Sequence, residues 1–114
     1  MKHQEPIRID QNLVNAWGRT LPELLNSTDS VDVKADSLDP HALQIFIRTA
    51  GHSKYGLQFK CAYVDDREVK VSFVSAHKGQ GCADEESEVV EELADDYIRH
   101  IHECAQALQT ITHA

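Results

Sequence analysis

The C-terminal segment, residues 84–114, constrains the fold more than any other part of this sequence. Apolar residues recur along it at steps of three and four, the spacing that gathers side chains on one side of an α-helix. This apolar stripe consists of Val90, Leu93, Ala94, Tyr97, Ile101, Cys104, Ala105, Leu108 and Ile111. The pattern predicts one long amphipathic helix, and such a helix must bury its stripe against another layer of structure.

The residues around position 84 indicate where this helix begins. Gly79 and Gly81 interrupt the preceding pattern, and Asp84 is a suitable N-cap. Glu85 and Glu86 follow in the first turn, where the helix dipole favours acidic side chains. We therefore expect the helix to start at Asp84.

Residues 31–75 show a period of two, which is typical of β-strands. Four segments alternate in this way, namely residues 31–35, 42–50, 55–64 and 68–75. The links between them are short, so consecutive strands are expected to pair antiparallel as a meander. The side chains expected to face inward are Val31, Val33, Leu43, Ile45, Ile47, Tyr55, Leu57, Phe59, Cys61, Tyr63, Val69, Val71 and Phe73.

A second helix is expected near the N-terminus, over residues 10–26. Asp10 is a good N-cap for it, and Gly18 is typical of a helix end. Thr20 and Glu23 then fit a capping box, which would begin a new helical turn. We therefore predict a kinked or broken helix whose apolar face contains Leu13, Val14 and Trp17.

These elements predict an α+β two-layer sandwich in the order α-β-β-β-β-α, with residues 1–114 in a single domain. The long C-terminal helix should cover the apolar face of a four-stranded antiparallel meander. The pattern leaves open whether the N-terminal helix shares that face or crosses an edge of the sheet. The opposite, outer face would carry Phe46, Val64 and Val74 among Arg48, Lys60 and Lys70.

The net charge of −8 is concentrated in one part of the chain. Residues 84–103 contain nine acidic residues and one basic residue, whereas the remaining residues contain ten of each. Direct DNA or RNA binding is disfavoured, because it normally requires a basic surface. The acidic side of the helix is either a solvated surface or a docking surface for a basic protein partner, as in a nucleic-acid mimic. The residues expected to bind such a partner are Glu88, Glu91, Glu92, Asp95 and Asp96, together with Phe46 and Val74 on the sheet.

Cysteine usage and hydropathy indicate a cytoplasmic protein. The three cysteines show no framework spacing, which fits a reducing compartment. No apolar run is long enough to span a bilayer, and residues 1–10 lack the apolar core of a signal peptide. We therefore expect no membrane association.

The histidine and cysteine residues offer an alternative, a metal or ligand site. His100 and Cys104 are four residues apart and could converge on one ion, but Cys104 belongs to the apolar stripe and is expected to be an inert, buried thiol. His100 can instead pair with Asp96. His77 and Cys82 lie between the last strand and the long helix, where a histidine and a helix N-terminus could activate a thiol.

The same segment contains a Gly-x-Gly turn at Gly79 and Gly81, which could bind phosphate through backbone N–H groups. The acidic residues 84–86 that follow would repel a phosphate at this position. We retain His77, Cys82 and His100 as the candidate metal or ligand residues.

We therefore expect a small acidic protein-binding or regulatory module that is not an enzyme, uses no cofactor and forms a homodimer. The dimer contact could use the outer sheet face, a sheet edge or the remaining helix surface. The alternative is a small-ligand- or metal-binding protein, or an enzyme, built around His77, Cys82 and His100.

Overall fold

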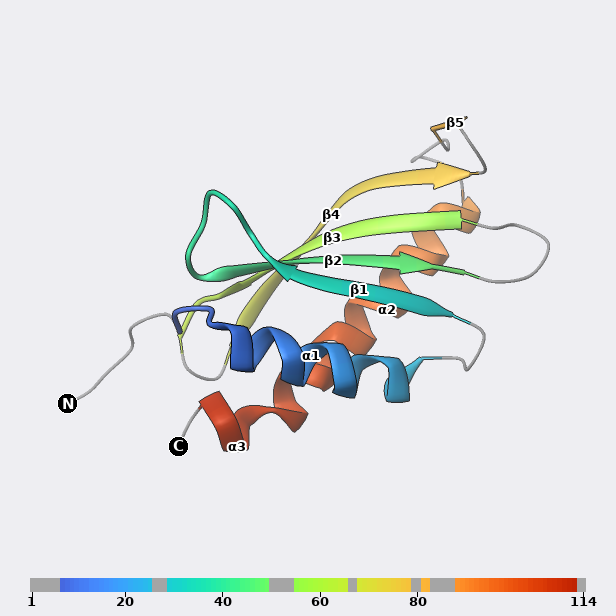
Figure 1. Ribbon diagram of the computed structural model, residues 1–114. Helices are drawn as coiled ribbons and strands as arrows, with labels where there is room; N and C mark the ends of the chain where they lie inside the picture. The colour runs from blue at the N-terminus through green and yellow to red at the C-terminus, as the bar shows by residue number, and fades with distance from the viewer. Residues whose placement is uncertain are drawn as a thin grey trace.

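A computed structural model of the protein describes residues 7–25, 29–49, 55–65, 68–78, 81–82 and 88–112. The chain forms a helix, a sheet and two further helices, as predicted for an α+β protein (Figure 1). In chain order the elements are α1 (Gln11–Leu24), β1 (Ser30–Ala35), β2 (Ala42–Arg48), β3 (Tyr55–Tyr63), β4 (Val69–Lys78), β5 (Gly81–Cys82), α2 (Glu88–Ala107) and α3 (Gln109–Thr112).

The sheet is the predicted antiparallel meander, in which β1, β2, β3 and β4 are neighbours in sequence order. It has one addition, the two-residue strand β5, which pairs with the end of β4. The prediction placed His77 and Cys82 in a loop, and this is wrong. His77 belongs to β4, Cys82 belongs to β5, and the two residues are register partners.

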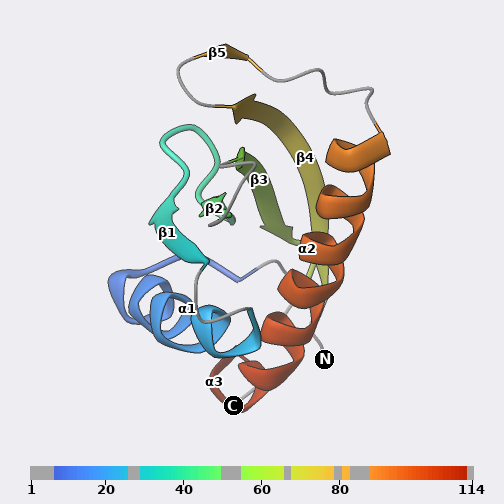
Figure 2. The ribbon, with the colours of Figure 1, turned by 90° about the vertical axis from the view of Figure 1, so that its right-hand side faces the viewer.

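Both long helices cover the same face of the sheet. Figure 2 shows the sheet curving over α1 and α2, with α1 next to β1 and α2 next to β4. The N-terminal helix therefore shares the covered face, a point that the sequence pattern left open. The core between the layers is continuous, and its fully buried members include Trp17, Leu21, Leu43, Ile45, Ile47, Leu57, Phe59, Cys61, Val90, Ile101 and Cys104.

A β-bulge divides β4 into two parts, and the set of alternate residues that faces the helices differs between them. Phe59 of β3 pairs with Phe73, whereas the preceding residue Gln58 pairs with Ser75, so Val74 has no partner in this ladder. After such a bulge the alternation of faces is reversed. Ala76 is consequently buried, at 1% exposure, although a strict period of two from Phe73 would place it on the outer face.

Helix α1 is continuous, which contradicts the predicted break at Gly18. Asp10 caps it as expected, since Asp10 Oδ1 accepts a hydrogen bond from the N–H of Leu13 at 2.8 Å. Gly18 lies in the helix interior, and Pro22 lies in the last turn. The apolar face on both sides of Gly18 packs into one core, and this burial outweighs the weak helix propensity of a glycine.

The C-terminal helix is interrupted, which also differs from the prediction. Helix α2 ends at Ala107, and the chain turns at Leu108 before α3. Leu108 is buried at 6% exposure, whereas Ile111 is 51% exposed and does not continue the buried stripe. The turn after Ala107 takes Ile111, the last residue of the stripe, away from the core. The predicted start at Asp84 lies outside the described residues.

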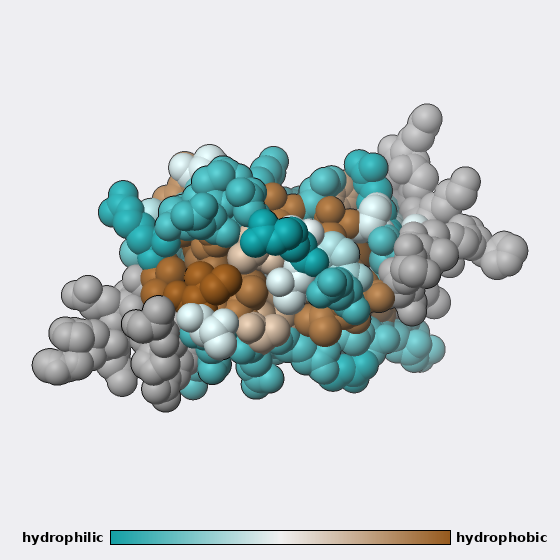
Figure 3. All heavy atoms as spheres, turned by 60° about the horizontal axis from the view of Figure 1, so that its bottom comes forward, coloured by the Kyte–Doolittle hydropathy of each residue, from teal (hydrophilic) through white to brown (hydrophobic). Residues whose placement is uncertain are grey.

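Within the described residues, no helix has the length and apolar character required to cross a membrane. Viewed with α1 and α3 toward the reader, apolar residues remain visible between polar ones on the helical side (Figure 3). The incompletely buried apolar residues of the helices, and of the position that caps α1, include Leu24, Leu25, Leu93, Ile98 and Ile111.

Candidate partner-binding surfaces

The acidic face of α2, which we define as Glu88, Glu91, Glu92, Asp95, Asp96 and Glu103, is exposed to solvent. Two of these carboxylates have a nearby partner on the same helix. Asp96 accepts a hydrogen bond from Arg99 at 2.7 Å, and Glu103 lies 2.8 Å from Nδ1 of His100. In the described part of the chain, the other four carboxylates have no ion pair, namely Glu88, Glu91, Glu92 and Asp95.

The spacing of these carboxylates places like charges next to each other. Glu88 and Glu92 are four residues apart, as are Glu91 and Asp95, and Glu92 and Asp96. Residues four apart are neighbours on a helix surface, and like charges at this spacing destabilise a helix by about 0.2–0.5 kcal/mol per pair. The acidic face therefore carries a repulsion that a bound cation would reduce.

An open hollow of about 410 Å³ lies between α2 and β4, beside the acidic face. We call it the α2–β4 hollow. Its apolar lining comes from Phe73, Ala94 and Ile98, and its carboxylates come from Glu91 and Asp95. Phe73 is held by a tilted contact with the buried ring of Phe59, with centroids 5.6 Å apart. The hollow thus combines a fixed apolar surface with two acidic groups.

Sequence reasoning identified the two carboxylates but not the hollow. Phe73 was expected to be an ordinary inward residue, and Ile98 lies one step outside the apolar stripe. Ala94 and Ile98 are four residues apart at the border of the stripe, beside Glu91 and Asp95. The sequence therefore shows that apolar and acidic side chains meet at this border of the helix. It does not show that Phe73 lies next to them, because this depends on where α2 packs on the sheet.

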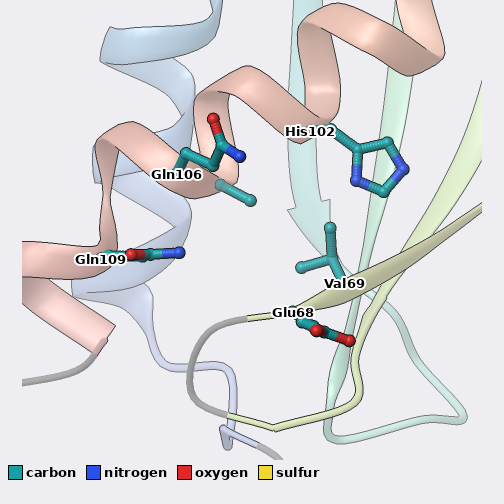
Figure 4. A pocket seen from close by; sticks show the side chains of 6 residues that line it. Glu68, Val69, His102, Gln106 and Gln109 are labelled. Atoms are coloured by element: carbon teal, nitrogen blue, oxygen red, sulfur yellow. The ribbon is translucent and has the colours of Figure 1, made fainter.

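A second open hollow, of about 440 Å³, lies near the other end of α2. Figure 4 shows His102 and Gln106 of α2 and Gln109 of α3 around it, opposite Glu68 and Val69 at the start of β4. Its lining is mainly polar, and none of its side chains is buried except Val69 and Ala105. Nothing in this lining distinguishes it from an ordinary solvated groove.

A third hollow, of about 220 Å³, lies between the end of α1 and α2 and contains His100. The predicted pair of Asp96 with His100 is not formed, because Asp96 bonds to Arg99 and His100 to Glu103. Tyr97 donates a hydrogen bond to Asp29 at 3.2 Å across this hollow. Burial, with the nearby Asp29 charge, raises the pKa of Tyr97, so its hydroxyl stays protonated and is unsuited to act as a base.

The outer face of the sheet carries the predicted apolar and basic residues. Val64 and Val74 are 52% and 49% exposed, and the guanidinium of Arg48 lies 5.1 Å from the centre of the Phe46 ring. The Phe46 ring lies against Gly56, where an added Cβ would be 2.8 Å from Phe46 Cε1. Phe46 and Arg48 therefore form a cation–π pair on this face, seated over a glycine.

The candidate metal residues are only partly brought together. His77 and Cys82 are directly opposite on β4 and β5, but His100 lies in the hollow between α1 and α2. Among the described residues, no group of three or more His, Cys, Asp or Glu side chains is arranged to hold a metal ion.

The other two cysteines are buried and reduced. Burial raises the pKa of the Cys104 thiol to about 12, and burial together with the nearby Cys104 also raises the pKa of Cys61. A thiol with a raised pKa is a poor nucleophile. The expectation that Cys104 is buried is confirmed.

The chain matches no protein-family model, no curated protein and no solved structure, so its function has to be inferred from its own residues and surfaces.

Proposed function

We propose that this protein is a non-enzymatic binding module that receives a basic segment of a protein partner on the acidic face of α2. In this proposal, an arginine or lysine of the partner occupies the α2–β4 hollow. The observation that carries the proposal is the combination within this hollow of Glu91 and Asp95 with Phe73, Ala94 and Ile98.

The hollow suits a basic side chain better than a purely apolar or purely polar one. Arginine and lysine carry an apolar stem below a charged head, and such a stem packs on apolar surface while its head reaches polar groups. Ala94 and Ile98 would receive the stem, and the Phe73 ring can attract the cation through its π face. Glu91 and Asp95 would pair with the charged head through charge-assisted hydrogen bonds.

The charge distribution of the whole face supports the same partner. Glu88 and Glu92 extend the acidic surface beyond the hollow, and neither has an ion pair within the described residues. A basic segment would reduce the repulsion between these neighbouring carboxylates while binding them. Complementary charge of this kind also accelerates association at low ionic strength.

A titration with a synthetic peptide containing the sequence Lys-Arg-Lys tests this proposal. At low salt, backbone amide shifts in NMR spectra should change most at Phe73, Ala94 and Ile98. Replacing both hollow carboxylates, Glu91→Gln with Asp95→Asn, should weaken peptide binding about tenfold or more, because two charge-assisted contacts are lost.

The matched control removes the same amount of charge elsewhere on the helix. Asp96→Asn with Glu103→Gln should reduce the affinity by less than about threefold, an effect of general screening only. If the two double variants weaken binding equally, or if the shifts spread evenly over α2, the hollow has no specific role.

A further inference from the structure

Strand β1 is an edge of the sheet, because it pairs only with β2. In an antiparallel ladder, successive residues direct their backbone N–H and C=O groups alternately toward the neighbouring strand and away from it. The N–H of Asp36, which follows β1, donates to the C=O of Ala42 at 3.0 Å, and this pair continues the β1–β2 register. By alternation, Asp32 and Lys34 also bond toward β2. The backbone groups directed toward the open edge belong to Val31, Val33 and Ala35.

These edge groups have no hydrogen-bond partner among the residues that the structure describes. The side chains around them are also incompletely covered. Strand β1 lies next to α1 (Figure 2). Val31 and Val33 pack against the core but are only half-buried, whereas their cross-strand neighbours on β2, Ile47 and Ile45, are fully buried. The β1 edge is therefore open to another strand.

The side chains of β1 are arranged to suit a second copy of the same strand. Asp32 and Lys34 are both exposed on the outer face, with Val33 between them. A twofold axis beside Val33 places Asp32 of each copy opposite Lys34 of the other. These would be non-hydrogen-bonded positions, where side chains in an antiparallel ladder are closest and opposite charges stabilise the pair.

The two neighbouring antiparallel registers bring like charges together. A shift of two residues in one direction places Lys34 opposite its own copy, and a shift in the other direction does the same for Asp32. A shift of one residue is excluded by hydrogen bonding. The outward N–H and C=O groups of one copy would then face residues of the other copy whose N–H and C=O groups are directed toward β2. The charge pattern of β1 therefore favours the register centred on Val33 over its neighbours.

We propose that two copies of this chain associate through their β1 edges, antiparallel and centred on Val33, to form one continuous sheet. On the covered face, Val33 then meets Val33 of the second copy, and Val31 meets Ala35. This extends the apolar layer and buries two valines that are half-exposed in the single chain. The contact does not involve the acidic face of α2, so it is independent of the proposed partner binding.

Charge swaps at β1 test the register. Sedimentation equilibrium should give twice the 12.8 kDa chain mass for the unmodified protein at submillimolar concentration. Asp32→Lys alone, or Lys34→Asp alone, opposes like charges at two symmetric positions and should raise the dimer dissociation constant about tenfold or more. The double variant Asp32→Lys with Lys34→Asp restores opposite charges and should recover the dimer. Lys70→Asp, an exposed change on β4, is the matched control and should have little effect.

A backbone change tests the edge itself. Val33→Pro removes an N–H that points away from β2, so the single chain keeps its ladder, but the dimer loses hydrogen bonds on both sides of the axis. It should abolish dimerisation while the circular dichroism spectrum stays unchanged. In the unmodified protein, the amides of Val31, Val33 and Ala35 should exchange hydrogen more slowly as concentration rises. A monomer at submillimolar concentration, or a dimer that the single charge variants leave intact, would overturn the proposal.

Discussion

Tyr63 shows how a polar group inside this core finds a hydrogen-bond partner. Its hydroxyl accepts a hydrogen bond from the indole N–H of Trp17 at 3.2 Å, and both side chains are buried. A buried N–H without a partner is costly, so the pair allows Trp17 to occupy the centre of the core. Burial also raises the pKa of Tyr63 to about 12, because the tyrosinate would lose its hydration.

This raised pKa predicts a loss of stability at alkaline pH. A raised pKa in the folded state means that the tyrosine contributes full stability below its ordinary pKa of 10.0 and loses it as pH rises from there toward 12. Tyr63→Phe should therefore reduce the steepness of the decline above pH 10. At neutral pH the same variant should be less stable by about 1–3 kcal/mol, because Trp17 loses its acceptor.

Urea denaturation followed by the fluorescence of Trp17, the single tryptophan, measures both effects. Some alkaline decline should remain in the variant, since burial also raises the pKa of Cys104 and Cys61. An unchanged pH dependence in Tyr63→Phe would contradict a protonated, buried Tyr63.

At the scale of the elements, glycine positions show how the same residue type serves two purposes. Gly18 lies inside α1, and a Cβ added there meets no atom within 4 Å. Gly56 lies in β3, and its missing side chain makes room for the Phe46 ring. The first glycine only weakens its helix, whereas the second allows a close contact.

The two glycines predict opposite results for one substitution. Gly18→Ala should stabilise the protein by about 0.5–1 kcal/mol, because alanine has the higher helix propensity and fewer unfolded conformations. Gly56→Ala should destabilise it by about 1–3 kcal/mol, because the new Cβ would collide with Phe46. Thermal and urea denaturation of both variants would measure this. A loss of stability in Gly18→Ala would mean that α1 is not regular at this position.

The elements also show how far the sequence determines the fold. The apolar stripe of the C-terminal helix and the alternation around Ile45 and Phe59 predict the sandwich, because each depends on a local period. The continuity of α1 through Gly18 and the bulge at Val74 were not predictable, because packing of distant segments decides both. The α2–β4 hollow was missed for the same reason, since Phe73 and Ile98 meet only in the folded chain.

At the scale of the whole molecule, charge is divided between surfaces. The described acidic face lies on α2, and Arg48, Lys60 and Lys70 lie on the opposite side of the sheet. Of these, Lys60 pairs with Asp39 at 3.4 Å. Repulsion along the acidic face costs folding stability, a cost that the proposed binding role would explain.

This trade-off predicts that Glu92→Lys makes the protein more stable and a weaker binder. The introduced lysine would lie four residues from Glu88 and from Asp96, so two repulsions become attractions. Stability should rise by about 1–2 kcal/mol at low ionic strength. Urea denaturation at low and at 1 M salt would show this, because salt screens the interactions and the gain should then vanish. A gain that persists at high salt would point to a cause other than charge.

The bulge at Val74 has a consequence for the length of the chain. Before the bulge the odd-numbered residues of β4 face the core, and after it the even-numbered residues do. Substituting side chains does not change which face of the sheet each position lies on. If the same residues paired without the bulge, Ala76 would turn to the solvent and His77 toward the core, whereas loss of Val74 would make the bulge unnecessary and leave both side chains on their present faces. The number of residues between Phe73 and Ala76 therefore decides whether this strand needs a bulge.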